Sequence, residues 1–339
     1  MCENLNTVTI MLVDNQINAV SQEELENDSR VVFNENDEQV GKDLSDIKHW
    51  ISSTPHMVNT RTDDLFLKLF LRGCNYSVKD TKEKLDMYFT VRLVCTFGIE
   101  IDITSYISRS LLPNWFDNWD PTEANLQKII RAGVFLPLQG YDKLGRYSIL
   151  VRMGQIDPCI MAAEDCYKVF IMIFNMVLEG NVQAQTKGMS LIMDMEGMGA
   201  CHSTMMNPNL LKKLVIVFQE AYPMDSEILV DLSRLYFLNM PKILEKLFSI
   251  FLSFLNKRYK KMMKIQDKDC STMSEEMGED ILPGEYGGSN RTCDELTSFW
   301  EEELTRQTPW LMAQRGFKTD ESARVGKSKL QNMLSCSIM

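Results

Sequence analysis

Three residues could form a hydrolytic centre. Asp194, His202 and Ser203 offer an acid, a base and a nucleophile, but such a triad works only when the three side chains converge in one hydrogen-bonded chain. Hydrolases of the α/β class expose their serine on a G-x-S-x-G turn, and the residues around Ser203 do not form one. We therefore expect His202 to be a hydrogen-bonded structural residue and Asp194 to brace the turn after its strand.

Two glycine-containing stretches resemble parts of nucleotide-binding loops. Residues 196–202 (EGMGACH) would follow a strand, yet His202 stands where a dinucleotide fingerprint needs a third small residue. Residues 326–328 (GKS) match the end of a phosphate loop, but residue 321 is Glu rather than Gly. The nine cysteines include no C-x-x-C pair, which argues against a zinc site. We expect no cofactor, no metal and no enzymatic activity.

The remaining candidate site is residues 241–264, where an apolar helix is followed by basic residues. At about 100° per residue, the polar positions of residues 242–256 share an arc of roughly 100°, and the apolar positions cover roughly 200°. One apolar flank holds Leu244, Phe248, Phe251 and Leu255, and the other holds Ile243, Leu247, Ile250 and Phe254. Two interpretations remain open: a helix buried on both sides, or a helix that covers an apolar cavity and touches a membrane.

A basic cluster follows this helix at once, at Lys257, Arg258, Lys260, Lys261 and Lys264. It is a local exception, because the chain carries a net charge of −11. That charge argues against nucleic-acid binding. The cations could complement the helix dipole or attract anionic lipid.

The composition is that of a globular protein. The 339 residues are 45% hydrophobic and 24% charged, and the longest apolar runs are too short to span a bilayer. The N-terminal residues lack a basic signal region, so we expect a cytoplasmic monomer with reduced thiols that associates reversibly with membranes.

Patterning divides the chain into five segments. We expect a weakly ordered segment at 1–40, a helical bundle at 41–110, an α/β domain at 111–290, a helix at 291–315 and a flexible tail at 316–339. The α/β domain should contain strands at 134–138, 146–154, 188–194, 234–239 and 262–265. Helices should begin at Asp157-Pro158 and Pro208, and residues 266–279 should form a polar linker. In the bundle, Thr62 should cap a helix that ends at Gly73.

Several motifs now appear in one order. TDDLFLKLFLRGCNYSVKDTKEKL (62–85), YDKLGRYSILVRMGQIDP (141–158), KGMSLIMDMEGMGACH (187–202) and LPGEYGG (282–288) resemble the CRAL-TRIO family of lipid-binding proteins. Within it, the chain looks most like the tocopherol and retinaldehyde carriers. The resemblance covers roughly residues 45–305 and implies an N-terminal helical bundle beside an α/β domain. A mostly parallel sheet would floor an apolar pocket, and the helix at 242–256 would be the mobile gate that closes it.

The resemblance also implies site residues. Positions that match the family's pocket lining are Ile171, Asn175, Met189, Met193, Leu214, Val217, Phe218, Tyr222, Phe248, Phe251 and Leu255. Ile243, Leu247 and Ile250 match gate positions that meet the membrane. The carriers hold a phosphoinositide head group at four basic positions, and only Arg258 is basic here. Lys257, Lys260 and Lys261 could substitute, so attraction to an anionic surface is the expectation.

Two functions follow from these patterns. The first is a carrier that binds one small tocopherol-, retinoid- or phospholipid-like molecule and exchanges it at membranes. The second is a scaffold or regulator that docks on membranes with the same fold and moves no cargo. A closed apolar cavity would favour the first, and a filled core the second.

The last four residues, 336–339 (CSIM), match the C-a-a-X pattern for prenylation of Cys336. One lipid chain gives only marginal membrane binding. The gate helix and its basic cluster would supply the second signal that stable anchoring needs.

Overall fold

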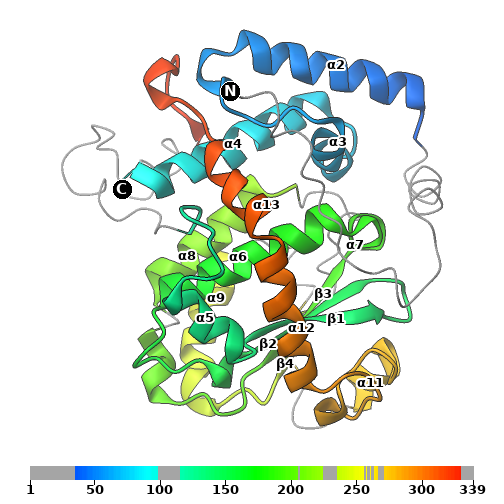
Figure 1. Cartoon of the computed structure of the whole chain (residues 1–339), viewed down its shortest axis with the longest axis vertical. Coiled ribbons are helices and arrows are strands. Elements are labelled where there is room, and N and C mark those ends of the chain that lie inside the picture. Colours follow the sequence, from blue (N-terminus) through cyan, green and yellow to red (C-terminus); the bar gives the residue numbers. More distant parts are fainter. Residues whose placement is uncertain are drawn as a thin grey trace.

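The computed structural model describes residues 35–97, 115–204, 207–223, 235–255, 257, 260, 263–265 and 271–329. Within these ranges three α-helices come first, and an α/β domain follows them (Figure 1). Its described sheet has five strands in the order β1-β2-β3-β4-β5. The first pair is antiparallel and the other pairs are parallel. The predicted fold class, a helical region followed by an α/β domain with a mostly parallel sheet, is confirmed.

The strands lie where the hydrophobic pattern predicts them: β1 Phe135–Tyr141, β2 Tyr147–Arg152, β3 Met189–Asp194, β4 Leu235–Leu238 and β5 Met263–Ile265. A tight turn joins β1 to β2, with Gly145 at φ 79°. The Asp142 carboxylate accepts the backbone N–H groups of Leu144 and Arg146 at 2.9 and 2.8 Å, which fixes this turn. β3 pairs with strands on both edges, and Met189 and Ile192 on its opposite faces are both buried, which accounts for its run of apolar residues.

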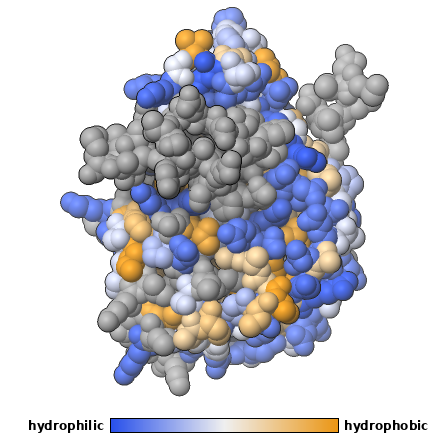
Figure 2. Space-filling view, turned by 90° about the vertical axis from the view of Figure 1, so that its left-hand side faces the viewer, coloured by the Kyte–Doolittle hydropathy of each residue, from blue (hydrophilic) through white to orange (hydrophobic). Residues whose placement is uncertain are grey.

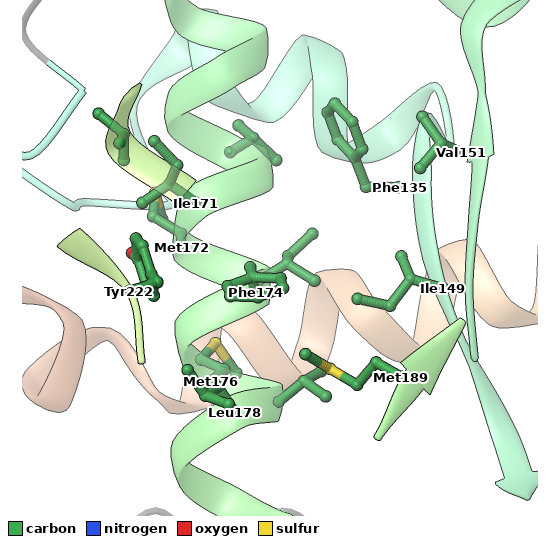
Figure 3. Close-up of a cluster of buried hydrophobic side chains, with 14 of the residues drawn as sticks. Phe135, Ile149, Val151, Ile171, Met172, Phe174, Met176, Leu178, Met189 and Tyr222 are labelled. Atoms are coloured by element: carbon green, nitrogen blue, oxygen red, sulfur yellow. The ribbon is translucent and has the colours of Figure 1, made fainter. Parts of the chain in front are cut away.

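Crossover helices connect the parallel strands: α6 Ala163–Gly180, α7 Val182–Lys187, α8 Pro208–Ile216 and α9 Glu245–Phe254. A π-helical turn, Val217–Ala221, continues α8. The side chains of Phe174 and Met176 on helix α6 point toward Ile149 and Met189 of the sheet (Figure 3). Its N-terminus is Ala163, not the predicted Asp157, because Asp157 instead forms a local turn in which its side chain accepts the Cys159 N–H at 2.9 Å.

Helix α12 (Cys293–Arg306) crosses the domain beside β1 (Figure 1). A capping box between Thr292 and Glu295 starts it. The Trp300 indole donates a hydrogen bond of 2.8 Å to the Pro137 carbonyl, which ties α12 to β1. Before it, α11 (Ser271–Met277) corrects the predicted polar linker, because Met273 and Met277 are fully buried and hold this short helix on the domain. After it, α13 spans Thr308–Ala313 and α5 (Ala124–Arg131) packs alongside.

The N-terminal helices are α2 Asp37–Ser53, α3 Asp64–Gly73 and α4 Val78–Phe97. Helix α2 begins four residues before the predicted start, because the Asn36 side chain caps it by accepting the N–H groups of Glu38 and Gln39. The cap of α3 is Asp63 rather than Thr62, since the Asp63 carboxylate accepts the Phe66 N–H at 3.1 Å. Gly73 ends α3 as predicted. The predicted boundary at residue 110 lies outside the described residues.

Residues 316–329 are a correction to the flexible tail. Their backbone N–H groups at Lys318 and Asp320 donate to the carbonyls of Asn59 (3.1 Å) and His56 (2.8 Å). The Arg324 guanidinium donates hydrogen bonds to both Asp86 carboxylate oxygens, at 2.6 and 2.9 Å, and the Arg324 side chain is only 6% exposed. The segment therefore lies against the N-terminal helices, and Lys329 reaches Glu220 of the π-helical turn at 3.0 Å. Cys336 lies outside the described residues.

Replacing Arg324 with Leu should release this segment. A buried bidentate Arg–carboxylate pair is worth about 1–3 kcal/mol, so we expect amide hydrogen exchange at Lys318 and Asp320 to accelerate about tenfold or more. The matched control is Arg315→Leu, because the Arg315 side chain is 54% exposed in its ion pair with Asp117. Equal protection of these amides in Arg324→Leu and the native chain would contradict the assignment.

Candidate ligand-binding site

An apolar cavity of about 190 Å³ lies between the sheet and helix α9. Its floor is a row of paired residues that crosses four strands, from Phe135 through Val151 and Met193 to Phe237. Because paired residues of neighbouring strands point to the same face, this row forms a continuous apolar surface. The position of the cavity follows from the strand register.

Two helices form the walls. From α6 come residues at helical spacing, Ala163, Cys166, Tyr167, Phe170 and Phe174. From α8 and the π-helical turn come Leu211, Leu214, Val215, Phe218 and Gln219. Phe170, Phe174 and Phe218 contact one another with ring centroids 5.0 to 6.0 Å apart. Both walls are thus single helical faces that meet through their aromatic rings.

Helix α9 closes the cavity. Phe248, Phe251 and Leu255 line it, and the Phe248 ring meets Phe237 of the floor edge to face at 4.6 Å. Leu244 on the same flank is 1% exposed. Ile250, by contrast, is 38% exposed. Of the two flanks predicted for this helix, the structure buries the first against the cavity and leaves Ile250 of the second on the surface.

The eleven predicted pocket residues divide between two places. Six line the cavity: Met193, Leu214, Phe218, Phe248, Phe251 and Leu255. The other five are at most 1% exposed and lie elsewhere: Ile171, Asn175, Met189, Val217 and Tyr222. Met189 shares a sheet face with Met193 but starts the strand about 13 Å away. Ile171 lies on α6 beside Tyr222, away from the sheet (Figure 3).

Asn175 and Tyr222 belong to a buried polar network between the N-terminal helices and the α/β domain. The Asn175 amide donates to the Tyr222 hydroxyl (2.5 Å) and to the Ile171 carbonyl (2.7 Å). Its oxygen accepts from the Tyr88 hydroxyl at 3.1 Å, and Arg92 donates to the Tyr88 oxygen. Burial raises the pKa of Tyr88 to about 12, so both tyrosines stay neutral donors at physiological pH. The network joins the two regions and does not face the cavity.

Cavity residues that the sequence analysis missed include Phe170, Phe174 and Gln219. A signal was present in the period of residues 211, 214, 215, 218 and 219, which share one helical face. That period places Gln219 beside Phe218 and excludes Val217. The match of single positions to a family pattern did not take into account which residues share a helical face.

Several predicted membrane-facing residues lie at the edge of what the structure describes. Lys257 and Lys260 are exposed after α9. The side chains of Ile243 and Leu247, and the residues Arg258 and Lys261, lie outside the described residues. Figure 2 shows hydrophobic residues at the surface of one face, among hydrophilic ones. None of the helices in the described part has the length and apolarity that crossing a bilayer requires.

The residues first considered for hydrolysis have structural partners. The Asp194 carboxylate accepts hydrogen bonds from the Tyr286 hydroxyl (2.6 Å), the Asn239 amide (2.9 Å) and the Glu196 N–H (2.9 Å). His202 is 5% exposed, with Nε2 at 3.0 Å from the Ile156 carbonyl and Nδ1 accepting the Gly199 N–H. Both residues brace the turn after β3, as predicted. Within the described ranges, no group of three or more His, Cys, Asp or Glu residues could hold a metal ion.

The comparisons with known proteins agree with this architecture. Residues 131–288 match the family model of the CRAL/TRIO domain, and residues 36–96 match that of a Pinta-like UBA domain. Clavesin-1 of Rattus norvegicus is 21% identical over 261 residues, covering 77% of this chain and 67% of that protein. Clavesin-2 of Mus musculus is 21% identical over 269 residues, covering 79% and 75%. The crystal structure of Sfh5 aligns at 12% identity and a TM-score of 0.43, covering 83% of this chain and 98% of that one, which is too distant to bear on the argument.

A helical N-terminal region beside a mostly parallel sheet that floors an apolar cavity defines a class of protein with a site for a small apolar molecule. Residues 131–288 are a CRAL/TRIO domain by their match to that family model, and clavesins resemble the chain over about three quarters of its length. The predicted CRAL-TRIO resemblance is confirmed for this domain. The finer resemblance to tocopherol and retinaldehyde carriers stays a prediction, since the relatives named above are clavesins.

Proposed function

We propose that this protein binds one small hydrophobic ligand in the cavity beneath α9 and exchanges it at membranes. The observation that carries the proposal is an apolar cavity lined by residues of the sheet, α6, α8, the π-helical turn and α9. Its volume of about 190 Å³ exceeds the roughly 150 Å³ of an engineered cavity that stays dry and binds benzene. A longer lipid needs more room, which an outward shift of α9 would supply.

Helix α9 suits such a gate because a single helix separates the cavity from the surface. Phe251 lines the cavity while its neighbour Ile250 is exposed. Insertion of Ile250 into a bilayer, with Lys257 and Lys260 near anionic head groups, would stabilise an open gate. General attraction to anionic lipid is the proposal here, and a phosphoinositide is one lipid that could supply the charge.

Native mass spectrometry of the full chain, followed by extraction of what it carries, tests the proposal. We expect one bound lipid per chain. Ala163 lines the cavity, so Ala163→Trp should fill it and remove the adduct. Ala200 is exposed, and Ala200→Trp should keep the adduct. If the native chain carries no lipid and takes up none from donor liposomes, the alternative of a membrane-docking scaffold or regulator replaces the carrier.

A further inference from the structure

Gln219 places a polar side chain in a cavity wall that is otherwise mostly apolar. Among the described residues that line the cavity, Gln219 is the one with a side-chain amide, and none is Lys, Arg, Asp or Glu. It follows Phe218, on the face of α8 and the π-helical turn whose other cavity residues are Leu, Val and Phe. An apolar residue would be expected at this place in the stripe. Its amide group therefore needs a hydrogen-bond partner.

The surrounding structure holds Gln219 in place. Its carbonyl accepts a hydrogen bond of 2.6 Å from the Lys84 Nζ of α4, and Lys84 is 7% exposed. The next residue, Glu220, pairs with Lys329 at 3.0 Å. The Lys84 hydrogen bond ties the backbone of the π-helical turn to α4. A π-helical turn is a type of helical irregularity that often marks functional sites.

The side-chain amide nitrogen of Gln219 is buried, and among the described residues it has no hydrogen-bond partner. A buried donor without an acceptor costs free energy, so native structures normally satisfy such groups with protein, water or ligand. We propose that the ligand completes this site: it presents a neutral hydrogen-bond acceptor, an aldehyde, ketone, ester or hydroxyl oxygen, to the Gln219 amide. This inference rests on the proposed function and specifies the ligand class for the same cavity.

The neutrality of the ligand follows from the other wall residues. With no cation among the described lining residues, a carboxylate or phosphate would lose its hydration without gaining a counter-ion. The Cys166 thiol on the opposite wall is also neutral, because burial raises its pKa to about 12. The cavity therefore selects an apolar body with one uncharged oxygen function.

A set of probes with one chain and different end groups tests this. Dodecane, dodecanal, dodecanol and dodecanoate are titrated calorimetrically into the delipidated full chain at neutral pH. We expect dodecanal and dodecanol to bind about tenfold more tightly than dodecane, which is the effect of satisfying one buried donor. Dodecanoate should bind at least about tenfold more weakly than dodecanal.

Gln219→Leu should abolish the preference for dodecanal over dodecane while leaving dodecane binding intact. Gln219→Met, which follows the same side-chain path, is the second variant if the first fails to fold. The control is Gln183→Leu, because the Gln183 amide donates to the Gly145 carbonyl at 2.9 Å outside the cavity and should leave the preference unchanged. Equal binding of dodecane and dodecanal to the native chain, or tight binding of dodecanoate, overturns the inference alone. If no probe binds, the proposed function fails with it.

Discussion

Phe251→Asp should abolish ligand binding, while Ile250→Asp should leave it nearly intact. The two residues are neighbours on α9, but Phe251 lines the cavity and Ile250 is 38% exposed. With the gate closed, a carboxylate at position 251 would lie in an apolar cavity without a counter-ion. We expect a loss of about 3 kcal/mol or more, which is roughly a hundredfold in affinity.

Membrane binding should show the opposite order. A carboxylate at position 250 would face an anionic surface and remove an apolar contact, so we expect about tenfold weaker co-sedimentation of Ile250→Asp with phosphatidylserine-containing liposomes. Because Phe251 faces inward, Phe251→Asp should change co-sedimentation less. Ligand affinity is measured by displacement of a fluorescent lipid, and folding by circular dichroism. Parallel losses in both assays for both variants would show that α9 does not separate cavity from membrane.

Asn175→Leu should lower the free energy of unfolding by about 2–4 kcal/mol, although Leu nearly preserves the volume. The Asn175 amide is 1% exposed and bonds the hydroxyls of Tyr222 and Tyr88. Each buried hydroxyl that loses this partner costs about 1–3 kcal/mol. The N-terminal helices should also separate more readily from α6, since Tyr88 belongs to α4.

A double-mutant cycle supplies the control for this network. Tyr222→Phe removes one of the hydroxyls that Asn175→Leu leaves without its partner, so the double variant should be less destabilised than the sum of the two single variants. Unfolding in urea gives each free energy. Additive losses, or a loss below about 1 kcal/mol for Asn175→Leu, would mean that the network contributes little to stability.

Local signals predicted individual elements well. The run at Met189–Asp194 is apolar on both faces because both faces of β3 are covered, with Met189 and Ile192 buried on opposite sides. A short strand was predicted at 262–265, and β5 spans Met263–Ile265. Helix ends were less accurate where two candidate caps adjoin. Thr62 and Asp63 are both good capping residues, and only the backbone geometry selects Asp63.

Predictions about the tail and the linker failed for a different reason. Residues 271–277 are polar in composition, but Met273 and Met277 find a buried place on the domain. Residues 316–329 have little hydrophobic pattern, yet Arg324 forms an ion pair with Asp86, which is distant in the sequence. The composition of a segment indicates whether that segment would fold in isolation. These two segments are instead ordered by contacts with residues that are distant in the sequence.

Periodicity in the sequence was enough to predict the elements, and several motifs in one order were enough to predict the CRAL-TRIO domain. It also determined that the helix after Pro241 has more apolar surface than one interior needs. Which faces of α6 and α8 meet the cavity depends on tertiary packing. Phe174 and Gln219 line the cavity, whereas Asn175 and Tyr222 lie at the boundary with the N-terminal helices. The physical reason is that hydrophobic period is a property of a local segment. The rotation of a helix over a sheet depends on all the side chains packed around it.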